Sequence, residues 1–161
     1  MAEGQSPPPL PESLNPYFEV IKKVIADLGL KPDECYNSEG HYWSLCRGSA
    51  EVFISLFPLG EGQEQEWYVE FSSPVMKVPS ENLLAFYRRL LEENAKWVST
   101  RFSVRGDTAW LDVTREIAGM DHDECRRSLT RIGDVADELD DILRGEFGGE
   151  EQKDQPQPPK A

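Results

Sequence analysis

The sequence has little positive charge and no long hydrophobic run. Its 161 residues contain 17 Lys and Arg against 30 Asp and Glu, which gives a formal net charge of −13. We expect no nucleic-acid partner, because proteins that bind phosphate backbones collect basic residues on one face. We expect no membrane association either. Anionic lipid surfaces repel such a chain, and no apolar run approaches the roughly 18 residues of a membrane-spanning helix.

Cysteines and familiar catalytic motifs are also scarce. The three cysteines, Cys35, Cys46 and Cys125, are odd in number and widely spaced, a pattern that favours reduced thiols and a cytoplasmic location. The segment Met1–Pro11 lacks the basic and apolar stretches of a secretory signal. The chain contains no phosphate-binding P-loop, dinucleotide-binding glycine pattern, nucleophile elbow or zinc-protease helix. We therefore expect no cofactor and no enzymatic activity.

What the sequence does contain is enough apolar material for one domain, with 39% hydrophobic and 10% aromatic residues. Residues 1–14 hold four closely spaced prolines and are predicted to be a disordered Pro-rich arm. Residues 15–147 are predicted to form a single folded domain. Residues 148–161 are rich in Glu, Gln, Lys and Pro, and such a composition predicts a disordered acidic, Pro-containing tail.

Three segments of the central region show helical periodicity. The first is expected to begin at Asn15 and Pro16, and the last at Asp121, which forms a capping-box pattern with Glu124. The middle helix is expected to begin at Ser80. Its expected buried stripe is Leu83, Phe86, Tyr87, Leu90 and Leu91.

Five segments alternate in the manner of strands and are joined by short turns, which favours antiparallel pairing. They are residues 41–47, 51–58, 66–72, 100–105 and 108–114. The predicted fold is therefore α+β, with a five-stranded antiparallel sheet and three helices in the order α-β-β-β-α-β-β-α. Val52, Ile54 and Leu56 are expected to face the helices, because they make one side of the middle strand uniformly apolar.

The opposite side of the predicted sheet remains aromatic although no segment is left to cover it. Apolar surface that stays exposed usually marks an interface. We therefore predict a protein-binding or dimer-forming surface, and we assign to it Phe53, Phe57, Tyr68 and Trp110.

An alternative function rests on the start of the last helix. His122 and Cys125 are three residues apart, a spacing that brings both to one side of a helix, and carboxylates adjoin them. This arrangement would suit a small metal-dependent regulator or enzyme. The competing interpretation is that Cys125 opens the buried stripe of the helix while His122 lies on its exposed first turn.

Charged residues further along the same helix form an acidic face. Its members are Asp134, Asp137, Glu138, Asp140 and Asp141. We expect a solvated face, with a docking surface for a basic partner as the alternative. The preceding Arg126, Arg127 and Arg131 are expected to pair with these acids at helical spacing rather than with a phosphate.

Two stretches carry a family resemblance. Pro79–Asn94 and Phe102–Leu111 resemble the corresponding helix and hairpin, with its Gly-Asp corner, of the type III secretion chaperone-like fold, and more closely of its YbjN-type members. The resemblance covers roughly residues 15–147 and includes the order of elements. It implies a chaperone-like protein-interaction or regulatory module, commonly homodimeric, that binds a segment of a client protein. The Pro-rich arm is not part of the family pattern.

Overall fold

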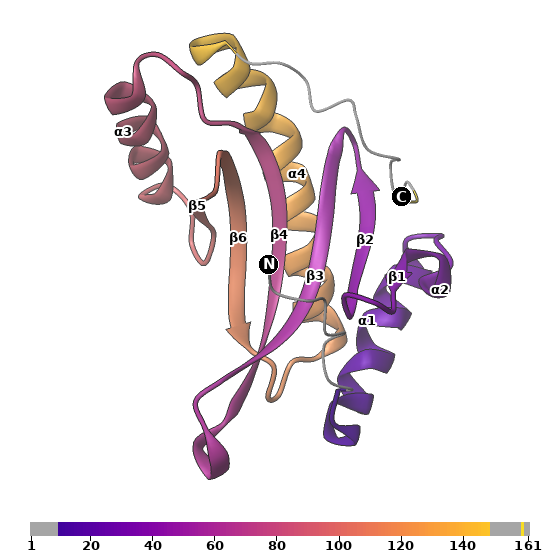
Figure 1. Cartoon of the computed structure of the whole chain (residues 1–161). Helices are drawn as coiled ribbons and strands as arrows, with labels where there is room; N and C mark the ends of the chain where they lie inside the picture. The colour runs from indigo at the N-terminus through magenta and orange to yellow at the C-terminus, as the bar shows by residue number, and fades with distance from the viewer. Residues whose placement is uncertain (1–9, 149–158, 160–161) are drawn as a thin grey trace.

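The computed structural model describes residues 10–148 and residue 159, and it shows an antiparallel sheet with helices along one side (Figure 1). The strands follow the order β1-β2-β3-β4-β6-β5. The strands are β1 (Tyr36–Asn37), β2 (Tyr42–Arg47), β3 (Ala50–Leu59), β4 (Glu66–Lys77), β5 (Arg101–Arg105) and β6 (Thr108–Glu116). The α-helices are α1 (Asn15–Asp27), α2 (Pro32–Cys35), α3 (Leu83–Asn94) and α4 (His122–Phe147).

The predicted α+β class with an antiparallel sheet is confirmed, but the predicted numbers of strands and helices are wrong. The described residues form six strands and four helices, because β1 and α2 were not expected. Helix α2 is a single turn of four residues, and β1 has only two, which pair with Tyr42 and Trp43 of β2. Elements this short have no periodicity that a sequence pattern could reveal.

The ends of the chain lie mostly outside the described residues, namely at 1–9, 149–158 and 160–161. Most of the arm and tail predicted for residues 1–14 and 148–161 falls there. Within the described part, Glu12–Leu14 form a 3-10 helix that runs directly into α1, and Leu14 is only 3% exposed.

The hydrophobic core lies between the sheet and α4, which runs along the back of the sheet in Figure 1. Val52, Ile54 and Leu56 of β3 point into this core, as predicted from their alternation. The expected capping box at the start of α4 is also present. The backbone N–H of Glu124 donates to the Asp121 carboxylate at 2.7 Å, and the Asp121 N–H donates to Glu124 at 3.2 Å.

Helix α3 lies beside the β5 edge rather than over the middle of the sheet (Figure 1). It begins at Leu83, not at Ser80 as predicted, because Asn82 adopts a left-handed conformation with φ 57° and delays the helix. Phe86 and Leu90 anchor α3 to the core, and Phe86 packs edge-on against Phe147 of α4.

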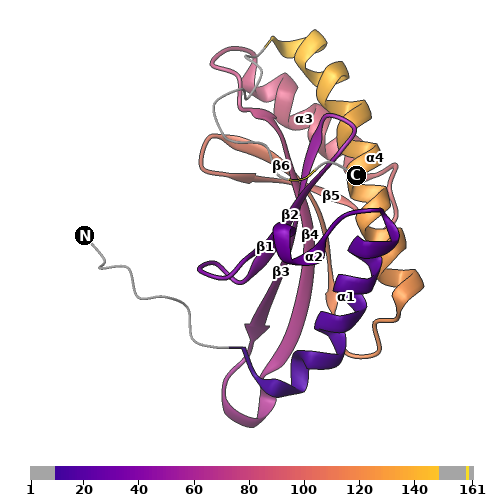
Figure 2. The same cartoon turned by 90° about the vertical axis from the view of Figure 1, so that its right-hand side faces the viewer.

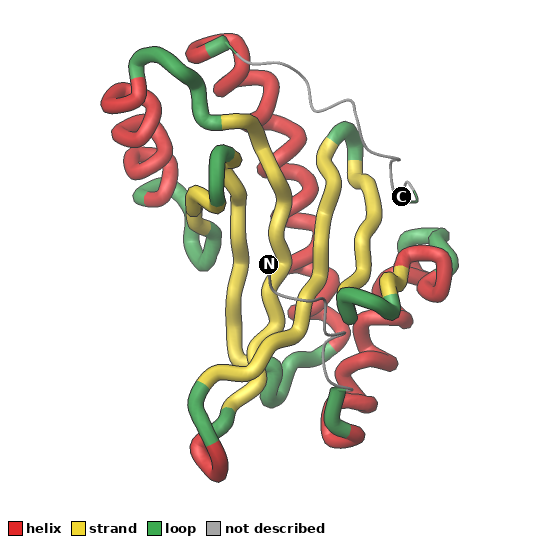
Figure 3. The backbone as a smooth tube through the Cα atoms, viewed as in Figure 1, coloured by secondary structure: helices red, strands yellow, loops and turns green. Residues whose placement is uncertain are grey.

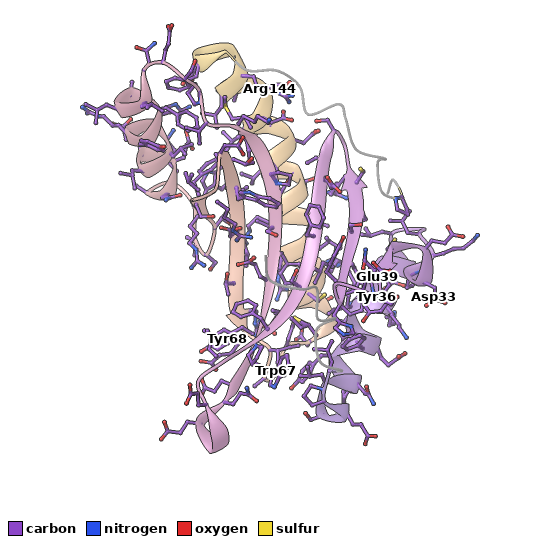
Figure 4. The ribbon with its side chains drawn as sticks, viewed as in Figure 1. Asp33, Tyr36, Glu39, Trp67, Tyr68 and Arg144 are labelled. Carbon is purple, nitrogen blue, oxygen red and sulfur yellow. The ribbon has the colours of Figure 1, made fainter. Side chains whose placement is uncertain are left out.

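The hairpin of β3 and β4 extends beyond the other strands (Figure 3). Its tip contains the 3-10 turn Gly62–Glu64. Figure 4 places Trp67 and Tyr68 toward the base of this hairpin, at the opposite end of the molecule from Arg144 of α4. Within the described residues, no helix is both long and apolar enough to cross a membrane.

Candidate functional site

The face of the sheet that points away from α4, here called the outer face, carries no helix of residues 10–148 (Figure 2). Strand alternation brings every second side chain of β2, β3, β4 and β6 to this face. The aromatic residues on it are Tyr42, Phe53, Phe57, Tyr68 and Trp110. Each of these rings is half-buried. The rings therefore shield one another and retain surface for a partner.

The aromatic rings of the outer face form two separate groups. In the central group, Phe53 lies 5.7 Å from Tyr42 and 5.9 Å from Trp110, measured between ring centroids. In the hairpin pair, Phe57 stacks on Tyr68 at 5.9 Å with an interplanar angle of 21°. The structure thus brings the four predicted residues together as two pairs. The sequence interpretation missed Tyr42, although alternation from the buried Trp43 would have found it.

An ionic cluster lies beside the central group. The Arg105 guanidinium donates to Asp112 at 2.6 Å and to Glu70 at 2.9 Å, and its carbon lies 5.2 Å from the centre of the Trp110 ring. Ser103 donates a further hydrogen bond to the Asp112 carboxylate. One cation from β5 therefore spans β6 and reaches β4.

Asp112 is the buried member of this cluster, with 1% of its surface exposed. Burial raises its pKa, and the hydrogen bond from Ser103 and the charge of Arg105 act in the opposite direction. Burial also raises the pKa of Glu51, which shares the outer face. With Glu70 included, these three acids outnumber the two guanidinium groups of this region, those of Arg105 and Arg101, which leaves this part of the outer face with an excess of one negative charge.

The sheet edge at β2 is only partly covered. β1 pairs with Tyr42 and Trp43 alone, so the remainder of β2 has no neighbouring strand on that side within residues 10–148. Pro159 lies at this open part, and its carbonyl oxygen accepts a hydrogen bond from the Cys46 N–H at 2.8 Å. The edge can therefore bind a second segment through backbone hydrogen bonds.

A second apolar surface lies on α3. The predicted buried stripe of this helix is wrong in part, because only Phe86 and Leu90 of its five members are buried. Leu84 is 85% exposed and Leu91 is 68% exposed, and Tyr87 lies between them at helical spacing. We call Leu84, Tyr87 and Leu91 the α3 stripe. Exposed apolar residues aligned along a helix are typical of a contact with another chain.

The residues of the metal-dependent alternative do not converge. His122 lies 2.7 Å from Asp27 of α1, measured from Nε2 to a carboxylate oxygen, while the Cys125 side chain is fully buried. Burial raises the pKa of the Cys125 thiol to about 12, which disfavours the thiolate that binds metals. Among the described residues there is no group of three His, Cys, Asp or Glu side chains that could hold a metal ion.

The acids of α4 make contacts different from those predicted. Asp134 lies 2.6 Å from the Arg47 guanidinium, and Asp137 accepts hydrogen bonds from Ser49. Asp140 pairs with Arg144. The predicted pairing with Arg126, Arg127 and Arg131 is wrong, because the partners of Asp134 and Asp137 come from β2 and the turn after it. None of the three arginines forms an ion pair within the described residues.

The topology and layer arrangement are those of type III secretion chaperones. One similar structure is the ExsC-ExsE complex, with a TM-score of 0.59, 16% identity, and coverage of 80% of this chain and 94% of that chain. Another is the Yersinia pestis type III secretion chaperone SycH in complex with a stable fragment of YscM2. Its TM-score is 0.53 and its identity 17%, and the match covers 76% of this chain and 98% of that chain. The heterodimeric ExoU-SpcU complex of Pseudomonas aeruginosa has a TM-score of 0.51 and 20% identity, and the match covers 79% of this chain and 97% of that chain.

The family can be stated more narrowly than the fold. The model of the YbjN family, described as "Putative bacterial sensory transduction regulator", matches residues 17–144. The chain therefore belongs to the YbjN family, as its resemblance in sequence predicted. Among curated proteins, none matches the chain significantly.

Proposed function

We propose that this protein is a non-enzymatic, chaperone-like or regulatory module that acts as a homodimer and binds an extended segment of a client protein. The observation that carries the proposal is the helix-free outer face, where five half-buried aromatic rings adjoin an open sheet edge. The related fold in complexes such as ExsC-ExsE supports a protein partner. A cytoplasmic location agrees with the free thiols of Cys35 and Cys125.

The client segment would add to the β2 edge and contact the central aromatic group with alternate side chains. The hydrogen bond from the Cys46 N–H to the Pro159 carbonyl oxygen supports this mode, because here an N–H group of the edge already donates to the backbone of another segment. Backbone bonds of this kind supply affinity without sequence preference. Selectivity would come from Phe53 and Trp110, because each keeps part of its ring exposed.

The chemistry of the outer face favours a client segment that carries both apolar and basic residues. Apolar side chains would cover the exposed ring surfaces, and basic side chains would be drawn to Glu51 and Glu70, since Asp112 is buried and already paired with Arg105. The net charge of −13 extends this attraction over the whole chain. Charge of this kind mainly raises the association rate, since the close contacts are apolar.

The α3 stripe is the surface that we assign to the homodimer. Leu84 and Leu91 are seven residues, or about two helical turns, apart on the same side of α3, so a second copy of α3 could cover both in an antiparallel arrangement. Burying a leucine side chain contributes roughly 1.5 to 3 kcal/mol. Two copies of the stripe would therefore supply a stable contact and leave both outer faces open to clients.

The client proposal is tested by capture from native lysate with immobilised wild-type chain and the Phe53→Asp variant. A charge among the rings should reduce the captured proteins at least tenfold. Ile142→Asp is the matched control, because it adds the same charge at a half-exposed apolar position of α4. Circular dichroism checks that both variants fold. Equal capture by Phe53→Asp and Ile142→Asp would contradict a role of the outer face.

The dimer proposal is tested by sedimentation equilibrium of the wild type and of Leu84→Glu/Leu91→Glu. The wild type should have twice the 18.3 kDa mass of one chain, and the double variant should sediment as a folded monomer. Leu84→Met is the control and should remain dimeric, because it preserves apolar volume. A wild type that is monomeric at micromolar concentration would overturn this part of the proposal and leave client binding as a separate question.

A further inference from the structure

A cavity of about 410 Å³ lies between α4 and the last residues of β6, at the margin of the outer face. It forms where β6 extends beyond β5: β5 pairs with β6 only as far as Asp112, whereas β6 continues to Glu116. The first half of α4 and the loop before β5 complete its walls. The lining residues that carry charge or a side-chain hydroxyl are Ser99, Thr114, Arg115, Glu116, Glu124, Arg127, Ser128 and Arg131.

The cavity concentrates positive charge in a strongly acidic protein. Acids outnumber bases by 30 to 17 in the chain, yet three arginines, Arg115, Arg127 and Arg131, meet around this one space. Arg127 and Arg131 lie four residues apart and therefore on the same side of α4. Arg115 faces them from the end of β6.

The three guanidinium groups differ in how far they are already engaged. Arg115 pairs with Glu124 at 2.9 Å, and Arg131 donates to the carbonyl oxygen of Val98 at 3.1 Å. Arg127 has no ion pair or hydrogen bond from its side chain within the described residues. The carboxylates further along α4 do not reach it, because Asp134 is held by Arg47. Two carboxylates also line the cavity, those of Glu116 and Glu124, so the three arginines leave an excess of one positive charge, and Arg127 is the guanidinium without a partner among the described residues.

The remaining lining suits an oxygen-rich anion. Ser99 and Ser128 supply hydroxyl groups, and Ser99 adopts a left-handed conformation with φ 65°, unusual for a residue other than glycine. Guanidinium groups bind phosphate and carboxylate through paired hydrogen bonds. A volume of about 410 Å³ lies within the range of small-molecule sites. The net charge of −13 makes a nucleic acid a poor occupant.

We propose that this cavity binds a small polyanion, a molecule carrying phosphate or several carboxylates, with Arg127 as its principal ligand and Arg131 and Arg115 in support. Arg131 also links the cavity to the loop between α3 and β5 through its bond to Val98. None of the three arginines belongs to the surfaces that we assign to the client and to the dimer, although Thr114 of the cavity wall contacts Glu70 of the outer face, so the site adds a small-molecule ligand to the proposed function.

The experiment is a titration of the full chain with inorganic phosphate and, in a second arm, with citrate, at constant ionic strength. Binding is followed by backbone amide shifts in heteronuclear NMR. We expect saturable shifts confined to Ser99, Arg127, Ser128 and their neighbours with at least one of the two anions. The arm that responds distinguishes a phosphate ligand from a carboxylate ligand.

Arg127→Ala and Arg126→Ala form the matched pair of variants. Both remove an exposed arginine from the same turn of α4, but only Arg127 lines the cavity. Arg127→Ala should weaken binding at least tenfold, and Arg126→Ala less than twofold. Absence of saturable shifts with both anions, or equal weakening by the two variants, would overturn the proposal. Because Phe53→Asp leaves the cavity intact, failure of client capture would not affect this result.

Discussion

The two faces of the sheet are built from the same strands and are both rich in aromatic residues, yet their surroundings differ. On the inner face, Trp43 and Phe71 are fully buried beneath the helices. On the outer face, Phe53 and Trp110 are covered, among the described residues, by each other and by neighbouring side chains. The inner rings stabilise the fold. The outer rings keep exposed surface that the fold alone does not require, and this surplus suggests a role in binding.

The largest expected difference between the faces is in stability. Phe71→Ala should lower the free energy of unfolding by about 3 to 5 kcal/mol, because it leaves a cavity in the core. Phe53→Ala should cost less, about 1 to 2 kcal/mol, since its ring is only partly buried. Urea denaturation measures both values. Equal losses would show that the outer rings belong to the core and would remove the distinction between the faces.

The ionic cluster gives the outer face its second distinguishing property. Arg105→Met should destabilise the chain by about 1 to 2 kcal/mol, because it leaves the buried Asp112 without its cation, while partial exposure of Arg105 limits the cost. Adding Asp112→Asn should recover part of the loss. Arg101→Met, on the same strand, removes one hydrogen bond to Thr114 and a more distant charge near Asp112, so it should cost less, at most about 1 kcal/mol. A loss from Arg105→Met no greater than that of the Arg101 control would contradict the cluster's contribution.

The two sides of the sheet should also respond oppositely to acid. Burial raises the pKa of Asp112 above its ordinary 3.8, so the folded chain takes up this proton first and gains stability as pH falls through the raised value. The hydrogen bond from Arg115 lowers the pKa of Glu124 below its ordinary 4.5, so its stabilisation is present above 4.5 and is lost as pH falls through the lowered value.

Asp112→Asn and Glu124→Gln test this difference. On acidification, the stability of Asp112→Asn relative to the wild type should fall, whereas that of Glu124→Gln should rise toward the wild type. Urea denaturation from neutral to acidic pH measures both trends. Slopes of the same sign would show that the two carboxylates share one kind of environment.

The smallest expected effect concerns the β2 edge. Truncation after Gly148 removes Pro159 and should speed hydrogen exchange at the Cys46 amide at least tenfold, because that N–H loses its acceptor. Global stability should change little. A chain truncated after Pro159 keeps the acceptor and is the control. Unchanged exchange in the shorter chain would contradict a persistent contact.

The inner face and α4 could be predicted because their signals are local. Alternation placed Val52 and Ile54 toward the helices, and the spacing of Asp121 and Glu124 predicted the capping box. These patterns depend on a few neighbouring residues and on backbone geometry alone. The two-residue β1 and the four-residue α2 could not be found in this way, because both are shorter than the repeats that reveal strands and helices.

The candidate sites were harder to predict because they depend on distant parts of the chain. The apolar spacing of α3 showed that the helix is amphipathic, but not that Leu91 lacks a cover. Asp134 and Asp137 were the expected partners of Arg127. In the structure Asp134 binds Arg47 and Asp137 binds Ser49, residues nearly ninety positions away along the chain. The type of a charged side chain alone does not reveal whether it finds a partner within the fold or is left to bind a ligand.

The bond between Cys46 and Pro159 has a consequence for any measurement of affinity. A peptide that adds to β2 beyond Trp43 must first displace a competitor tethered to the same molecule, and tethering keeps that competitor at a high effective concentration. The apparent dissociation constant of the full chain would then exceed the intrinsic one by the inverse of the fraction of molecules whose edge is vacant. The ratio of affinities before and after truncation would report that fraction directly.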